Sequence, residues 1–199
     1  MRLVSGDLSL EVISQLMAKN KKTTATEVIV SKTKAEIIKE ALRIEESTRY
    51  AAKSHYNDGA MWGFCHLLLG VPTTVLSALV AVKSFAQFDS NHNTAGIIAL
   101  VVAGLSGLMT FLNPNQKAAV HHKAGSDYDS LNNKVRIFRT IDCWGKDADI
   151  VLTARLKEFS EEKSKLHADN PQTSFIGYTF AKWGIKKGEA EFVVDAKEE

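Results

Sequence analysis

The stretch MWGFCHLLLGVPTTVLSALVAV, residues 61–82, decides the fold together with a second stretch shortly after it, AGIIALVVAGLSGLMTFL, residues 95–112. The two runs are 22 and 18 residues long, and neither contains Asp, Glu, Lys or Arg. At ~1.5 Å of rise per residue, helices of these lengths measure ~33 and ~27 Å, about the thickness of a bilayer's hydrocarbon core. The sequence therefore predicts a transmembrane helical hairpin with two spans.

The composition of the whole chain hides these runs. The 199 residues average to a mean hydropathy of -0.11, which is ordinary for a soluble protein. The net charge of +2 is close to neutral and argues against nucleic acid as a direct partner. Cys65 and Cys143 lie too far apart for a CxxC or zinc-binding spacing, and they suit a reducing compartment.

Basic residues around the runs predict the orientation of the hairpin. The connection between the runs carries only Lys83, which is close to Asp89. The flanks carry Arg43, Arg49 and Lys53 before the first run, and Lys117, Lys123, Lys134, Arg136 and Arg139 after the second. The positive-inside rule then places both termini in the cytoplasm. No signal peptide is expected, because the first 60 residues are polar.

The rest of the chain reads as helix, so the predicted fold class is all-α. Apolar residues recur at spacings of three and four, as in Ile37, Ala41 and Ile44. The expected cytosolic helices cover about 33–58, 116–143, 148–168 and 175–188. These helices are expected to form a cytosolic bundle under the hairpin.

The two ends of the chain are expected to differ from the helical part between them. Residues 1–32 form an N-terminal extension, with a short helix over Asp7–Lys19 and a loop over Asn20–Thr26. The helix that starts near Thr33 is expected to continue into the first span almost without a break, since no Pro or Gly interrupts it before Gly59. A disordered tail is expected over 193–199.

Small and polar residues share one face of the first span. The candidates for lining a pore are His66, Gly70, Thr73, Ser77 and Ser84. Their hydroxyls and exposed backbone would pass water and ions. The same pattern also favours helix packing, since small residues let membrane helices approach closely and hydroxyls bond across them. Both interpretations hold together if packing within an oligomer places this face near a central axis.

The second span carries small residues at every fourth position, and we call this set the ladder: Ala95, Ala99, Ala103 and Gly107. Such a pattern indicates close helix–helix packing. The ladder is predicted to form either the contact within the hairpin or the contact between subunits.

His66 is the strongly ionisable group inside a span, and its predicted depth in the hairpin matches Ser106 and Thr110. A Ser–His dyad would suggest an intramembrane hydrolase, but two spans cannot seal a catalytic cavity. A neutral His bonded to a hydroxyl is favoured, with gating or proton sensing as the alternative. The chain has no recognised catalytic motif, so we do not expect an enzyme or a cofactor.

Just after the second span, Lys117 and Lys123 are candidates for contact with lipid phosphates. His121 and His122 lie between them, but no further ligand follows at a recognised spacing. No metal site is therefore predicted.

The chain resembles the SLATT domain, a two-span effector domain of bacterial conflict and anti-phage systems, over roughly 33–192. A polar helix leads into two close spans in both. The residues that carry the resemblance are Gln116-Lys117-Ala118-Ala119-Val120-His121-His122, Gly125, Tyr128, Leu131, Lys134-Val135-Arg136, Pro171, Ala181, Gly184-Ile185 and Lys187-Gly188-Glu189.

The resemblance implies an oligomeric effector that forms a pore in, or disrupts, the bacterial inner membrane. In this family the trigger comes from a partner that senses infection, such as an enzyme that makes a nucleotide signal. No fused sensor domain is recognised in this chain, so the sensor is expected to be a separately encoded protein or the small cytosolic bundle itself. The alternative is a membrane-anchored module that docks a partner through its cytosolic helices and does not conduct.

Overall fold

The computed structural model describes the backbone of residues 7–86 and 93–189, and the side chains of residues 32–82 and 94–189. Every regular element in these ranges is helical, so the all-α prediction is confirmed for them. The elements are α1 (Asp7–Ala86), α2 (Asn93–Leu112), α3 (Pro114–Thr140), the 3-10 helix η1 (Asp142–Trp144), α4 (Asp149–Asp169) and α5 (Phe175–Lys186). The predicted tail over 193–199 and the side chain of Ser84 lie outside the described residues.

Helix α1 is one continuous helix of 80 residues. The expected run into the first span is confirmed, but the predicted loop over Asn20–Thr26 is wrong. That segment is polar and threonine-rich, yet it holds no Gly or Pro that would break the backbone hydrogen-bond ladder. Pro72 lies inside the helix without ending it.

The helical backbone is interrupted between α2 and α3 at Asn113, which has φ 42° and ψ 56° in the left-handed region. Pro114 then takes the first helical position of α3, where its missing N–H leaves no hydrogen bond unmade. Helices α4 and α5 begin and end within two residues of the predicted bounds. Ser174 caps α5, because its hydroxyl accepts the Gly177 N–H at 2.9 Å.

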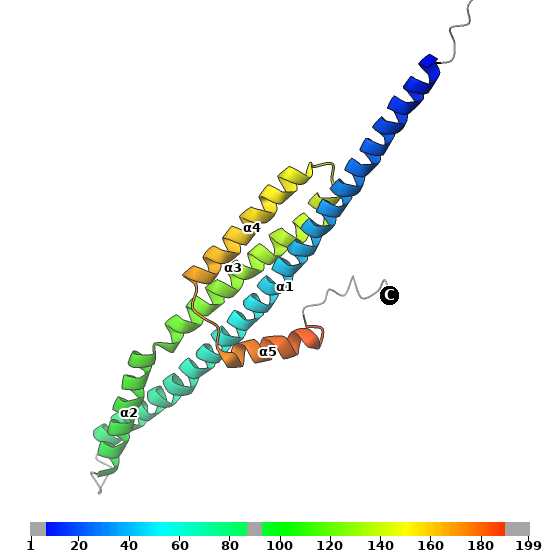
Figure 1. Ribbon diagram of the computed structural model, residues 1–199. Coiled ribbons are helices and arrows are strands. Elements are labelled where there is room, and N and C mark those ends of the chain that lie inside the picture. The colour runs from blue at the N-terminus through cyan, green and yellow to red at the C-terminus, as the bar shows by residue number, and fades with distance from the viewer. Residues whose placement is uncertain (1–6, 87–92, 190–199) are drawn as a thin grey trace, which may run out of the picture.

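Helices α1, α3 and α4 pack lengthwise into a bundle (Figure 1). Its core joins all three helices through Ile37, Ala41, Ile44, Leu131, Val135, Phe138, Cys143 and Leu152. Phe159 of α4 meets the edge of Phe138, with 5.4 Å between the ring centroids. The apolar periodicity seen in the sequence therefore marks the faces that build this core.

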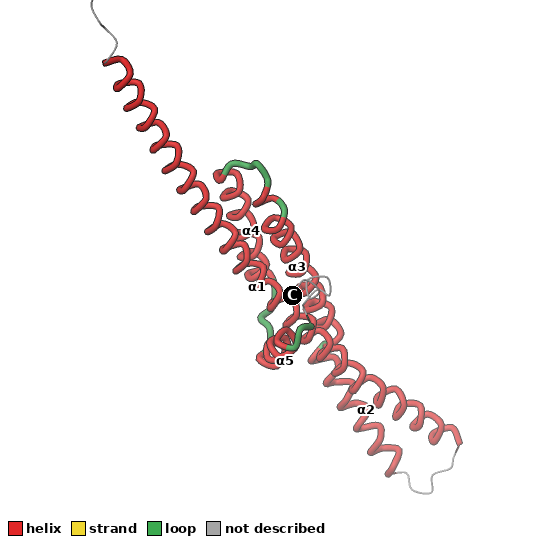
Figure 2. The backbone as a smooth tube through the Cα atoms, turned by 90° about the vertical axis from the view of Figure 1, so that its right-hand side faces the viewer, coloured by secondary structure: helices red, strands yellow, loops and turns green. Residues whose placement is uncertain are grey.

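Beyond the bundle, the end of α1 and all of α2 continue as a two-helix arm (Figure 2). We call residues 61–82 and 94–112 the apolar arm. Both helices are long and apolar enough to cross a membrane, and the most apolar stretch of each has no buried residue. Large side chains point outward along it: Leu100 is 75% exposed and Phe111 is 87% exposed.

Candidate functional site

The contact between α1 and α2 in the apolar arm is made by large side chains of α2. Gly70 of α1 lies opposite Met109, whose Cε would be 3.6 Å from a Cβ built on that glycine. The half-buried residues along this face of α2 are Ile98, Val102, Leu105, Met109 and Leu112. The hairpin is thus closed by bulky residues that fit against a small one.

The ladder lies for the most part on the opposite face of α2. Ala99, Ala103 and Gly107 are exposed, and only Ala95 is half-buried. A Cβ added to Gly107 would meet nothing within 4 Å. The predicted role of these three residues in closing the hairpin is therefore wrong for a single chain. A contact between subunits stays a prediction.

The pore-lining candidates divide between two environments. His66, Gly70 and Thr73 are half-buried on the side of α1 that meets α2, whereas Ser77 is exposed. The hydroxyls of Thr73 and Ser77 donate within α1 itself, to the carbonyls of Leu69 at 2.6 Å and Thr73 at 2.7 Å. Within the chain, this face serves packing, and Ser77 alone of the described candidates is free to face a neighbour.

His66 does not pair with the hydroxyls predicted to share its depth. Gly70 of α1 lies opposite Met109 of α2, and the two helices run antiparallel. His66, one turn before Gly70, is therefore level with the end of α2, beyond Thr110. The Thr110 hydroxyl donates to the carbonyl of Ser106 instead. Among the described residues, the buried Nδ1 of His66 finds no hydrogen-bond partner. The predicted His–hydroxyl bond at this depth is wrong.

The two lysines predicted at the lipid surface differ. Lys117 places its Nζ 4.3 Å from the ring centroid of Trp62, at the base of the apolar arm. Lys123 forms an ion pair with Asp127 one turn along α3, at 2.7 Å. The environment of Lys117 suits a lipid phosphate better, and contact with lipid stays a prediction for both.

Between the apolar core and the apolar arm, the bundle contains a layer of buried polar side chains that was not predicted from the sequence. Its members are Glu45, Thr48, Ser54, His55, Asp58, His121 and Asn132. A signal was present, because Glu45, Thr48 and His55 continue the core-facing stripe of Ile37, Ala41 and Ile44. Polar residues on a core-facing stripe indicate buried hydrogen bonds or a site.

Glu45 ties α1 to α3 at one end of this layer. Its carboxylate accepts from Arg49 at 3.0 Å and from Arg139 of α3 at 2.7 Å. Beside it, Asn132 of α3 donates to the hydroxyl of Thr48 at 3.0 Å. Each of these contacts gives a buried polar group a hydrogen-bond partner. Two of them join α1 to α3, so the layer fixes the register of the two helices that lead into the apolar arm.

His55 and His121 form the other end of the layer. Their Nδ1 atoms lie 3.0 Å apart, so one neutral ring donates to the other. The His55 ring also stacks on Tyr128, with 5.5 Å between centroids. Burial and the nearby His121 lower the pKa of His55 from 6.5 to about 4, and burial lowers the pKa of His121 as well.

The stability of the protein should therefore fall with acidification below neutral pH. The unfolded chain, with a His pKa of 6.5, binds more protons than the folded one until the pH reaches about 4. We expect a loss of about 3 kcal/mol between these limits. Denaturant unfolding at a series of pH values should show this slope, and His55→Gln should flatten it. If the unfolding free energy of that variant depends on pH as steeply as that of the unmodified protein, His55 is not the group responsible.

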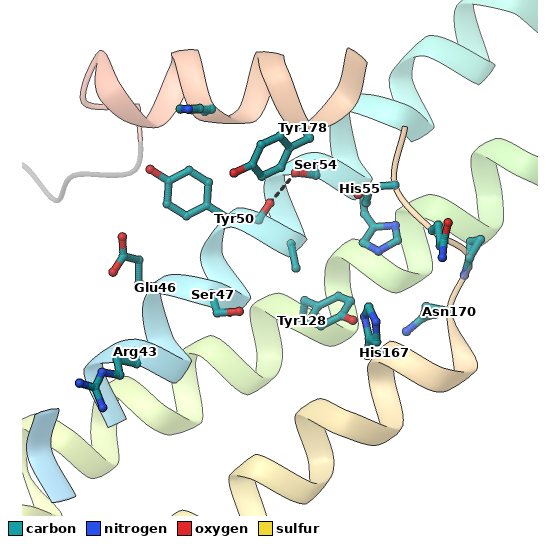
Figure 3. Close-up of a pocket in the computed structure, with 15 residues that line it drawn as sticks. Arg43, Glu46, Ser47, Tyr50, Ser54, His55, Tyr128, His167, Asn170 and Tyr178 are labelled. Atoms are coloured by element: carbon teal, nitrogen blue, oxygen red, sulfur yellow. Dashed lines mark hydrogen bonds between the residues drawn. The ribbon is translucent and has the colours of Figure 1, made fainter. Parts of the chain in front are cut away.

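A cavity of about 800 Å³ lies beside this layer, between α1, α3, the segment after α4, and α5. Figure 3 shows Tyr50 and Tyr178 next to each other in its wall, and their ring centroids are 6.5 Å apart. Tyr128, His167 and Lys182 contribute to the wall. The lining offers ring faces and hydrogen bonds to a small polar molecule. Among the described lining residues, no hydrogen bond joins a serine or threonine hydroxyl to a histidine.

Comparisons with protein-family models, curated proteins and solved structures gave no match. The resemblance to the SLATT domain therefore stays a prediction from the residues quoted above.

Proposed function

We propose that the apolar arm spans a membrane as a two-pass hairpin, with the bundle and both termini in the cytoplasm. The observation that carries this proposal is the uncovered apolar surface of the arm, where large side chains such as Phe64 and Leu100 are exposed. An apolar surface of this extent is costly in water and favourable in lipid. Helices also satisfy their own backbone hydrogen bonds, as the bilayer requires.

On this basis the protein is an oligomeric effector of the SLATT type. It would form a pore in, or disrupt, a bacterial inner membrane during anti-phage defence, when a separate sensor triggers it. One hairpin cannot enclose a pore, so several copies are needed. The exposed ladder supports this step, because small residues allow membrane helices of different subunits to approach closely.

The continuity of α1 supports a route from trigger to membrane. The same helix lines the cavity with Tyr50 and His55 and then enters the apolar arm. A sensor that binds one packing of the bundle better than another would shift the population of the arm's arrangements. The polar layer is where α1 and α3 are held together above the arm, so a change of register there would reach both spans.

The experiment is leakage of ions and dye from liposomes that hold the purified protein. Ser77→Leu removes the exposed hydroxyl candidate, and Gly107→Leu fills the ladder. We expect both variants to lose leakage, whereas Leu79→Ile on the lipid-facing side keeps it. Leakage that survives both substitutions would contradict an oligomeric pore with Ser77 in its lining.

The cavity favours a second candidate, a membrane-anchored module that binds its partner through the cytosolic helices. A cavity of about 800 Å³ is large enough for a sizeable side chain cluster or a small molecule. In this case the arm is only an anchor. Replacing residues 61–112 with an unrelated two-span hairpin would then preserve activity, whereas the effector requires its own spans.

A further inference from the structure

Helix α5 crosses α1 at the base of the apolar arm, where the bundle ends (Figure 1). Its start is fixed there by Asp58, whose carboxylate accepts the N–H of Ser174 at 2.7 Å. Asn57 also donates to the carbonyl of Gly177 at 3.2 Å. A Cβ at Gly177 would come within 2.2 Å of Asp58, so the glycine permits this close approach. The position of α5 beside the first span is thus set by specific contacts.

The sides of α5 differ in what they meet. Gly177, Ala181 and Gly184 are buried, and Asp58 and Lys53 of α1 lie against the two glycines. Another side, carrying Tyr178 and Lys182, lines the large cavity. The remaining side shows Ile176, Phe180 and Trp183, at the i, i+4 and i+7 positions of one helical stripe. We call these three residues the Trp183 face.

The Trp183 face is turned toward the apolar arm. Its three residues line one groove together with Ala60 and Met61, the residues at which the apolar arm begins. Phe180 is 60% exposed and Trp183 is 56% exposed, so more than half of each side chain is uncovered in the described chain. The Trp183 face therefore extends the exposed apolar surface of the arm onto α5.

Charged residues lie beside this face, and Glu189, which lines the same groove, is ion-paired with Lys53. Lys187 places its Nζ 3.5 Å from the centroid of the Trp183 ring. Two further lysines of the same helix are exposed: Lys182 at the edge of the large cavity and Lys186 in the last turn. Trp62 and Lys117 repeat the same pairing of ring and ammonium at the start of the span. Tryptophan rings beside lysines are typical of the level of lipid headgroups.

We propose that the Trp183 face of α5 lies in the cytosolic surface of the membrane, with its apolar side chains among the lipid headgroups. This inference rests on the proposed insertion of the apolar arm. Amphipathic helices bind the interface by burying one apolar face and by attraction of lysines to anionic lipids. Helix α5 then holds the bundle to the membrane at a third point, beside the two spans.

The test measures quenching of tryptophan fluorescence by brominated phospholipids in liposomes that hold the full-length protein. The chain has three tryptophans, so single-tryptophan proteins are simple to make. Trp62→Phe with Trp144→Phe leaves Trp183 as the reporter. Trp62→Phe with Trp183→Phe leaves Trp144, which is 75% exposed in η1 at the far end of the bundle. Phe64→Trp, with all three native tryptophans replaced by Phe, reports on the arm itself.

We expect Trp183 to lose emission with lipids brominated near the headgroup, while Trp144 keeps its emission. Quenching of the Phe64→Trp protein but not of Trp183 would overturn the role of α5 and leave the inserted arm standing. No lipid quenching in either protein would overturn both. Shielding of Trp183 from acrylamide as well as from brominated lipid would show that protein covers this face, which also overturns the inference.

Discussion

We expect Gly107→Leu and Ala103→Leu to abolish the proposed assembly of the protein in membranes. Both positions are exposed on the face of α2 that turns away from α1, and a side chain added at Gly107 meets nothing in the same chain. A leucine there leaves the hairpin intact but separates neighbouring helices that need close backbone approach. Chemical crosslinking in native membranes, followed by sizing in mild detergent, should show the loss of oligomers.

The matched control is Val101→Leu, which enlarges an exposed side chain on a different side of α2 from the ladder. This variant should crosslink like the unmodified protein. If the Gly107→Leu and Ala103→Leu proteins still form the same oligomers, the ladder is not the subunit contact.

We expect Glu45→Gln to lower the free energy of unfolding by about 3 kcal/mol. The Glu45 side chain is only 2% exposed and is paired with both Arg49 and Arg139. Removing its charge leaves two partly buried guanidinium groups without their counter-ion, one of them on the other helix. Denaturant unfolding of the protein in detergent micelles measures the loss.

Glu40→Gln is the control for this substitution. Glu40 pairs with Arg43 on the surface of the same helix, where both side chains are largely exposed. Such a pair contributes about 0.5 kcal/mol or less. Equal effects of the two substitutions would contradict the role of Glu45 in fixing α1 against α3.

The helical framework could be predicted from the sequence because its signals are local. The apolar runs, the absence of Gly and Pro between Thr33 and Gly59, and the periodicity around Ile37 and Leu131 each act within a few turns of helix. The error over Asn20–Thr26 came from polar composition, which does not by itself end a helix.

The rotation of α2 against α1 could not be predicted in the same way. Helix α2 is apolar on all sides, so the spacing of its residues does not say which face meets α1. The fit of Met109 against Gly70 decides this, and it depends on side-chain shape across two helices. The ladder therefore faces outward although its pattern alone also suited the hairpin contact.

The polar layer and the cavity depend on residues far apart in the chain. His55 and His121 are 66 positions apart, and Asp58 reaches Ser174 across 116 positions. No single segment carries the pattern of such a site. The sequence indicates only the part of the polar layer on α1, where polar residues occupy core-facing positions.

The orientation of the apolar arm is the claim on which the other proposals depend, and labelling of single cysteines measures it directly. With Cys65→Ala and Cys143→Ala as background, Ser90→Cys lies in the connection between the spans and Ser160→Cys lies on the exposed side of α4. A membrane-impermeant maleimide added to spheroplasts should label the Ser90→Cys protein at once. It should label the Ser160→Cys protein only after permeabilisation. Equal labelling of both proteins before permeabilisation, or of neither, would contradict a two-pass hairpin with a cytoplasmic bundle.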